Sequence, residues 1–217
     1  MILRGWNLRP RPGRYDDAIG LITEGIKLAD RHGGREIRLT QAAADGPNTG
    51  VLVLTCGFEN LTAYGRYLDE MAVDAEAHSF THRIREAEGP FVYESTAVLA
   101  EIDLGRADAN QAHGRVLDVR YGRPIAGRWD ETLAFAREAF DICDANGAVG
   151  CHLFELDHAG DRSGWLCAVM EYESMTAFGA AGDRWMAGAG RCLTERLRAD
   201  APFAPVSSGL FTEVEVF

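Results

Sequence analysis

The sequence lacks the features that mark several large functional classes. None of its apolar runs approaches the roughly 20 residues that a transmembrane helix requires. No cluster of Lys and Arg marks a surface for nucleic acid or anionic lipid, and the formal net charge of the 217 residues is −11. The apolar part of the N-terminus is too short for a secretory signal peptide. We therefore expect a cytoplasmic protein that binds neither nucleic acid nor membrane.

Several catalytic and metal-binding motifs are missing as well. There is no HExxH zinc motif, no GxSxG nucleophile elbow and no GK[ST] phosphate loop. The five cysteines are odd in number, none forms a CxxC pair, and all lie within apolar segments. This usage favours reduced, buried thiols over disulfides or a zinc site.

What the sequence does contain is an internal duplication. The segment GRYDDAIGL at Gly13–Leu21 returns 114 positions later as GRWDETLAF at Gly127–Phe135. At the same offset, ENLTAYG at residues 59–65 is matched by ESMTAFG at residues 173–179. A period of about 110 residues is far longer than that of a solenoid repeat. We expect two copies of one small domain, at 1–105 and 114–217, joined by a polar linker at 106–113.

Each copy shows the pattern strand, helix, strand, strand, helix, strand. In the first copy these predicted elements lie at about 2–9, 14–32, 37–43, 51–58, 61–86 and 92–104. The order is that of a ferredoxin-like βαββαβ unit, with a four-stranded antiparallel sheet and two helices on one face. Because the other face also carries apolar residues, we predict an α+β fold in which the two sheets pack into one intramolecular barrel.

This topology, with the strand-to-helix phrases CGFENLTAYGRYLDEM and VMEYESMTAFGAAGDRW, resembles the dimeric α+β barrel superfamily. That superfamily includes antibiotic-biosynthesis monooxygenases and NIPSNAP-like proteins, and here one chain would supply both halves. The resemblance implies a small-molecule-binding barrel. Three functions stay open: a cofactor-independent monooxygenase or isomerase acting on an apolar or aromatic compound, a non-catalytic NIPSNAP-like or stress-responsive binding protein, and a haem-binding or haem-degrading monooxygenase. The helices also leave a surface for a further homodimer.

The most distinctive local feature is the pair His78 and His82, four positions apart on the predicted second helix. On one continuous helix they extend a stripe that includes Tyr64 and Met71, so both imidazoles would point inward or lie at the rim of a pocket. In the second copy the same stripe would carry other residues, namely Trp185, Cys192 and Arg196.

Three interpretations of the histidine pair stay open. The pair is a packed histidine beside a surface one, or a metal site completed by Asp74 or Glu86, or the proton-handling or haem-facing part of a pocket. The resemblance to haem-degrading members places Asn7, Tyr67 and His78 around such a pocket.

We therefore expect His78 to serve as the acid–base group, with Tyr67 and Asn7 orienting a substrate. We expect that the protein uses no cofactor and no metal. The alternative is haem, and His78 and His82 would then be the residues that hold it. The predicted substrate pocket consists of Tyr64, Met71, Trp185, Cys192 and Arg196.

Overall fold

The protein is described by a computed structural model for residues 1–86, 88–106 and 113–216. Six of the eight residues in the expected linker at 106–113 fall outside this described part. Within the described chain, no helix is long and apolar enough to cross a membrane.

The chain forms two compact units, which we call the first and second unit. The first unit contains Met1–Ala43, Pro47–Ala100 and the terminal segment 213–216. The second unit contains Ala44–Gly46 and the described residues of Glu101–Thr212. Each unit therefore takes a short segment from beyond the boundary that the duplication suggests.

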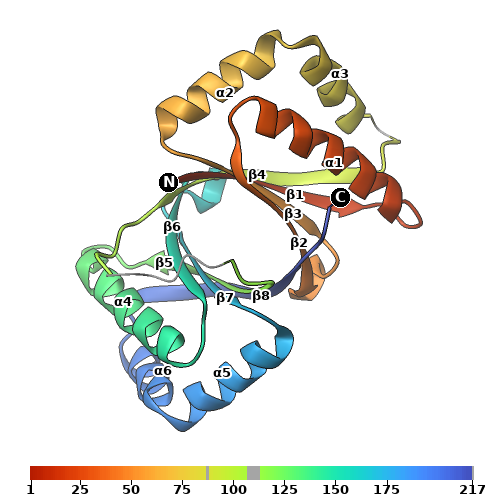
Figure 1. Cartoon of the computed structure of the whole chain (residues 1–217). Coiled ribbons are helices and arrows are strands. Elements are labelled where there is room, and N and C mark those ends of the chain that lie inside the picture. The colour runs from red at the N-terminus through yellow and green to blue at the C-terminus, as the bar shows by residue number, and fades with distance from the viewer. Residues whose placement is uncertain (87, 107–112, 217) are drawn as a thin grey trace. The chain divides into compact units, whose positions relative to one another are not determined.

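The first unit is a four-stranded antiparallel sheet covered on one face by helices. Its strands are paired in the order β2-β3-β1-β4. Figure 1 shows α1, α2 and α3 on the same side of this sheet. In chain order the elements are β1 (Ile2–Pro10), α1 (Tyr15–Arg31), β2 (Arg35–Ala44), β3 (Leu52–Phe58), α2 (Leu61–Val73), α3 (Ala75–Ile84) and β4 (Phe91–Glu101).

The second unit repeats this arrangement. Its antiparallel strands are paired in the order β6-β7-β5-β8, and α4, α5 and α6 lie on one side of the sheet (Figure 1). The elements are β5 (Val116–Pro124), α4 (Trp129–Ala145), β6 (Gly150–His158), β7 (Leu166–Tyr172), α5 (Met175–Ala187), α6 (Ala189–Ala199) and β8 (Phe203–Glu213). The α+β class and the ferredoxin-like element order are confirmed.

The long second helix expected in each copy is in fact two helices. Asp74 has extended backbone angles (φ −82°, ψ 120°), and its carboxylate accepts hydrogen bonds from the backbone N–H groups of Glu76 and Ala77 at 2.7 and 3.2 Å. It therefore caps α3. Gly188 makes the corresponding break between α5 and α6. A break of this kind shifts the helical phase, so a stripe drawn across it is not continuous.

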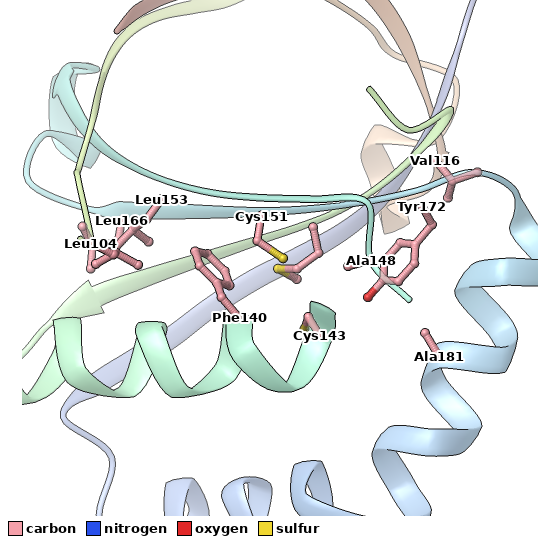
Figure 2. Close-up of a cluster of buried hydrophobic side chains, with 11 residues drawn as sticks. Leu104, Val116, Phe140, Cys143, Ala148, Cys151, Leu153, Leu166, Tyr172 and Ala181 are labelled. Carbon is pink, nitrogen blue, oxygen red and sulfur yellow. The ribbon is translucent and has the colours of Figure 1, made fainter. Parts of the chain in front are cut away.

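The core of each unit lies between its helices and its sheet. Figure 2 shows the buried cluster of the second unit, in which α4 packs against strands β6 and β7. Leu104, which precedes the undescribed segment, is 7% exposed within this cluster. In the first unit, Val214 and Val216 pack against the core, and the backbone N–H of Val214 donates to the carbonyl of Leu39 at 2.8 Å. The crossing segments are thus integral to the units that receive them.

Candidate functional site

The second unit holds a pocket of about 750 Å³ between its sheet and its three helices. That volume falls in the range of small-molecule sites. Its walls are mainly apolar and aromatic, and they include Phe135, Phe140, Met170, Phe178, Trp185, Leu197 and Leu210. Such a lining favours a flat, apolar ligand.

Two charged side chains on β5 reach this pocket. Asp118 and Arg120 are two positions apart, so they point to the same face of the sheet. Arg120 Nη2 donates to Asp118 Oδ2 at 2.7 Å, and Nε donates to the same oxygen at 3.1 Å. The Asp118 side chain is 10% exposed and that of Arg120 is 58% exposed. The carboxylate is therefore nearly closed off, whereas the guanidinium extends into open pocket space.

The charge state of Arg120 follows from these surroundings. Burial would lower the pKa of its guanidinium, but the hydrogen bond and the negative charge of Asp118 outweigh burial and raise it above its ordinary value. Among the described residues, Asp118 is the hydrogen-bond acceptor that Arg120 contacts. Arg120 thus stays cationic and keeps donor capacity for a ligand.

Trp185 is fixed in the pocket wall by its neighbours on α6. Its indole Nε1–H donates to Thr194 Oγ1 at 3.0 Å. A Cβ atom added to Gly190 would lie only 2.2 Å from the Trp185 ring, so this position has room only for a glycine. The close approach of α6 to Trp185 depends on that missing side chain.

The first unit fills the corresponding space with side chains. At the offset of 114, Asp118 and Arg120 correspond to Arg4 and Trp6, and Ala168 corresponds to Leu54. Trp6 and Leu54 pack against the first unit's core, and the Arg4 guanidinium lies 5.6 Å from the centre of the Trp6 ring. At two of these three positions, Trp6 and Leu54, the first unit thus carries an apolar side chain where the second unit has a pocket-lining residue.

His78 and His82 do not point inward, which was one of the two orientations expected for them. Both side chains are exposed, and that of His82 is 83% exposed. His78 Nε2 lies 2.6 Å from the carbonyl oxygen of Ala72, and His82 Nδ1 lies 3.6 Å from a Glu86 carboxylate oxygen. The cause is the helix break at Asp74: the phase of α3 is shifted, and its buried residue is Ala77 instead.

The three residues expected to share a catalytic pocket are not brought together. Tyr67 is 6% exposed and packs 4.9 Å from Phe58, centre to centre, and burial raises the pKa of its phenol to about 12. Asn7 alternates with Trp6, so it lies on the sheet face opposite the helices, where its Nδ2 donates to Ser95 Oγ at 2.8 Å. With His78 exposed, the catalytic roles assigned to these side chains have no shared site here.

The predicted pocket residues divide in a similar way. Tyr64 and Met71 pack against the first unit's core, and Trp185 lines the pocket of the second unit. Cys192 is exposed. Arg196 is also exposed, and its Nη1 donates to Glu138 Oε1 at 2.7 Å. As in the first unit, the break at Gly188 turns these two residues away from the sheet.

A haem held by histidine does not fit this pocket. None of the described residues that line it is a histidine, and its sulfur-containing residues are Cys143 and Met170. Nor does the described part of the chain contain a group of three or more His, Cys, Asp or Glu side chains arranged to hold a metal ion. The lining is suited to an organic ligand.

No protein-family model and no curated protein sequence matches the chain. Solved structures do. A "putative monooxygenase" from Lactobacillus acidophilus aligns with a TM-score of 0.61 and 11% identity over 98% of this chain and 92% of that one. An "anthrone oxidase-like protein" aligns with a TM-score of 0.57 and 14% identity over 99% of this chain and 92% of that one. A chlorite dismutase from Candidatus Nitrospira defluvii aligns with a TM-score of 0.54 and 9% identity over 99% of this chain and 91% of that one. At these identities the likeness shows the fold alone: an α+β architecture shared with monooxygenase-like and chlorite dismutase-like proteins.

Proposed function

We propose that the second unit binds an apolar, ring-containing compound that carries an acidic hydroxyl or an oxygen-centred anion, and oxidises it with dioxygen without a cofactor. The observation that carries this proposal is the aromatic-walled pocket with Arg120 projecting into it. An apolar ring gains burial against the phenylalanines and Trp185. The guanidinium then selects the ligand's oxygen group.

The Asp118–Arg120 pair supplies the chemistry that such a substrate needs. Asp118 is a nearly buried carboxylate that can accept a proton from a ligand hydroxyl or an activated ring carbon. Arg120 stabilises the anion that results, because it remains charged in the pocket. An electron-rich substrate anion can itself donate electrons to dioxygen, so no resident redox group is required.

Support for the reaction class comes from the neighbours by fold. Two are described as putative monooxygenases and one as anthrone oxidase-like. Anthrone has a fused three-ring skeleton and forms an oxygen-centred anion on losing a proton from its methylene group. It therefore serves as a test substrate: one dioxygen would convert the methylene to a carbonyl and release one water.

The first experiment measures the role of Arg120 in binding with two matched fluorescent probes. 1-Anilinonaphthalene-8-sulfonate carries a charge, and N-phenyl-1-naphthylamine has the same rings without it. We expect Arg120→Gln to weaken sulfonate binding by about 2 kcal/mol, roughly 30-fold in Kd, and to leave the neutral probe nearly unchanged. Arg196→Gln, which alters an exposed arginine of the same unit, should change neither.

The second experiment follows oxygen uptake with anthrone in an oxygen electrode. We expect the wild-type protein to accelerate oxygen uptake and to form anthraquinone. Asp118→Asn and Arg120→Gln should both reduce the rate of uptake. If the charged probe binds but anthrone causes no protein-dependent uptake, the oxygenase activity is refuted and a non-catalytic binding protein becomes the better description. If Arg120→Gln keeps its fold and binds both probes as the wild type does, the pocket assignment itself fails.

A further inference from the structure

One pocket-lining group has no part in the proposed oxidation, namely the thiol of Cys143. Cys143 lies on the last turn of α4, is 7% exposed, and contributes to the pocket wall. Figure 2 shows it in the same buried cluster as Cys151 on β6 and Tyr172 at the end of β7. Both of these side chains lie close enough to its sulfur to affect the pKa of the Cys143 thiol.

The surroundings of Cys143 favour a negative charge on its sulfur. The adjacent Cys151 side chain lowers the pKa of the Cys143 thiol, burial opposes this, and the positive charge of Arg120 lowers it further. The charge of Asp118 and the C-terminal end of α4 act in the opposite direction, while the nearby Tyr172 hydroxyl also lowers the pKa of the Cys143 thiol. The net direction is downward.

Cys151 is placed differently, although the two thiols are adjacent. Its Sγ lies 3.4 Å from Asp144 Oδ1, a carboxylate that also pairs with Arg106. The adjacent Cys143 side chain, burial and the charge of Asp144, to which the Cys151 S–H donates, all raise the pKa of the Cys151 thiol. The single S–H of Cys151 is therefore given to Asp144, and of the two thiols it is Cys143 that lines the pocket and can meet a ligand.

We propose that Cys143 captures electrophilic ligands of this pocket, as the covalent attachment site for a ring compound with a carbon–carbon double bond conjugated to a carbonyl. The inference rests on the proposed ligand pocket, because Cys143 is reached through it. The ligand class follows from the walls: the aromatic side chains hold a ring, and Arg120 faces the carbonyl oxygen.

The step is a conjugate addition that needs no oxidant or reductant. Cys143 loses its thiol proton, and a lone pair on Sγ forms a bond to the alkene carbon distant from the carbonyl. The π electrons of the double bond move toward the carbonyl oxygen and form an enolate, which then takes up one proton. Thiol and alkene have become a thioether, and Arg120 stabilises the enolate while it lasts.

The test uses N-phenylmaleimide on the full-length chain with Cys192→Ser, which removes the exposed thiol and is outside the pocket. Intact mass and peptide mapping follow the adduct over time. We expect one adduct, on Cys143, while the buried Cys56 and Cys167 stay unmodified. N-phenylsuccinimide has the same ring and carbonyls but no double bond, so it should slow labelling by occupying the pocket without reacting.

A second variant tests the electrostatic part of the inference. Losing the guanidinium in Arg120→Gln should raise the pKa of the Cys143 thiol and slow its labelling about tenfold at neutral pH. Arg196→Gln should label at the parental rate. Circular dichroism and thermal unfolding of each variant confirm the fold, and the N-phenylsuccinimide competition stands as an independent readout if Arg120→Gln does not fold.

Labelling of Cys143 only after unfolding, or at a rate that neither N-phenylsuccinimide nor Arg120→Gln changes, would overturn the proposal. The same samples are assayed for sulfonate-probe binding. Binding of the probe with an inert Cys143 refutes covalent capture and leaves the proposed function intact. A reactive Cys143 in a protein that binds neither fluorescent probe refutes the proposed function and leaves the thiol assignment standing.

Discussion

The difference between the two copies can be tested by exchanging one residue between them. Ala168 on β7 lines the pocket of the second unit, and its counterpart Leu54 on β3 packs against the first unit's core. Both lie centrally in their sheets and pair with equivalent positions, Arg120 and Trp6. Ala168→Leu should therefore fill part of the pocket, and Leu54→Ala should open a space in the first unit.

The expected free energies have opposite signs. A leucine at position 168 adds about three methylene-sized groups, each worth about 0.8 kcal/mol on burial, so the upper limit of its stabilisation is about 2 kcal/mol. Leu54→Ala removes the same groups from a packed site and should cost about 2–3 kcal/mol of unfolding free energy. The sulfonate probe should lose its affinity in Ala168→Leu and keep it in Leu54→Ala.

Urea unfolding and probe titration on the two variants decide the matter. A loss of several kcal/mol in Ala168→Leu would mean that side chains already occupy the space, which refutes the pocket. Undiminished probe affinity in a folded Ala168→Leu protein would mean that the ligand binds elsewhere. The reciprocal outcome, binding lost with stability kept or raised, is the result that an open cavity requires.

Three further predictions concern packing and charge. Gly190→Ala should lower the free energy of unfolding by about 1–3 kcal/mol, since its Cβ would meet the Trp185 ring at 2.2 Å. Gly182→Ala on α5, where a Cβ meets nothing within 4 Å, should instead raise it by about 0.5–1 kcal/mol in thermal unfolding, and equal effects of the two variants would contradict this packing. The pKa of Asp74 is lowered by its hydrogen bond to His32 and by the backbone N–H groups it caps, so the stabilisation by Asp74 is present above its unfolded pKa near 4 and is lost as the pH falls through the lower folded value. His32→Gln should therefore make the free energy of unfolding fall less steeply at acid pH, and an unchanged acid limb would refute the contribution of His32. Fragments 1–105 and 106–217 should each be less stable alone than in the chain, because Leu104 and Val214 would be severed from the cores they join; a fragment 1–105 that unfolds at the same urea concentration as the whole chain would show the crossing segments to be dispensable.

The repeated segments were sufficient to predict the fold of each unit. Two independent copies of one pattern constrain the element order twice. The glycines that follow the first helix of each copy, Gly33 and Gly147, have φ of 83° and 97°, values that favour glycine. The helix break was missed because Asp74 is a favourable residue both in a helix surface stripe and at an N-cap. Nothing in the 3.6-residue spacing distinguishes the two.

The site was harder to predict, because a cavity is defined by what several distant residues fail to fill. His78 and His82 were predicted as site residues because of their chemistry, but the shift of helical phase at Asp74 leaves both side chains exposed. Trp185 was identified, but Asp118 and Arg120 were not. A signal for them existed in the repeat: in VLDVRYGRP, Asp118 and Arg120 share a strand face with the buried Val116, at positions where the other copy has Arg4 and Trp6.

The presence of two similar units in one chain explains how the protein can stay folded with such a pocket. A cavity of about 750 Å³ forfeits packing contacts that a domain of about 100 residues can rarely lose. Here the first unit retains a filled core, with Trp6, Leu54 and Phe80 packed between helices and sheet. The second unit carries Asp118 and Arg120 on the wall of its pocket, and the core packing of the first unit involves neither residue. If this division holds, substitutions that abolish ligand binding should lie in the second unit, and substitutions at the equivalent positions of the first should act on stability alone.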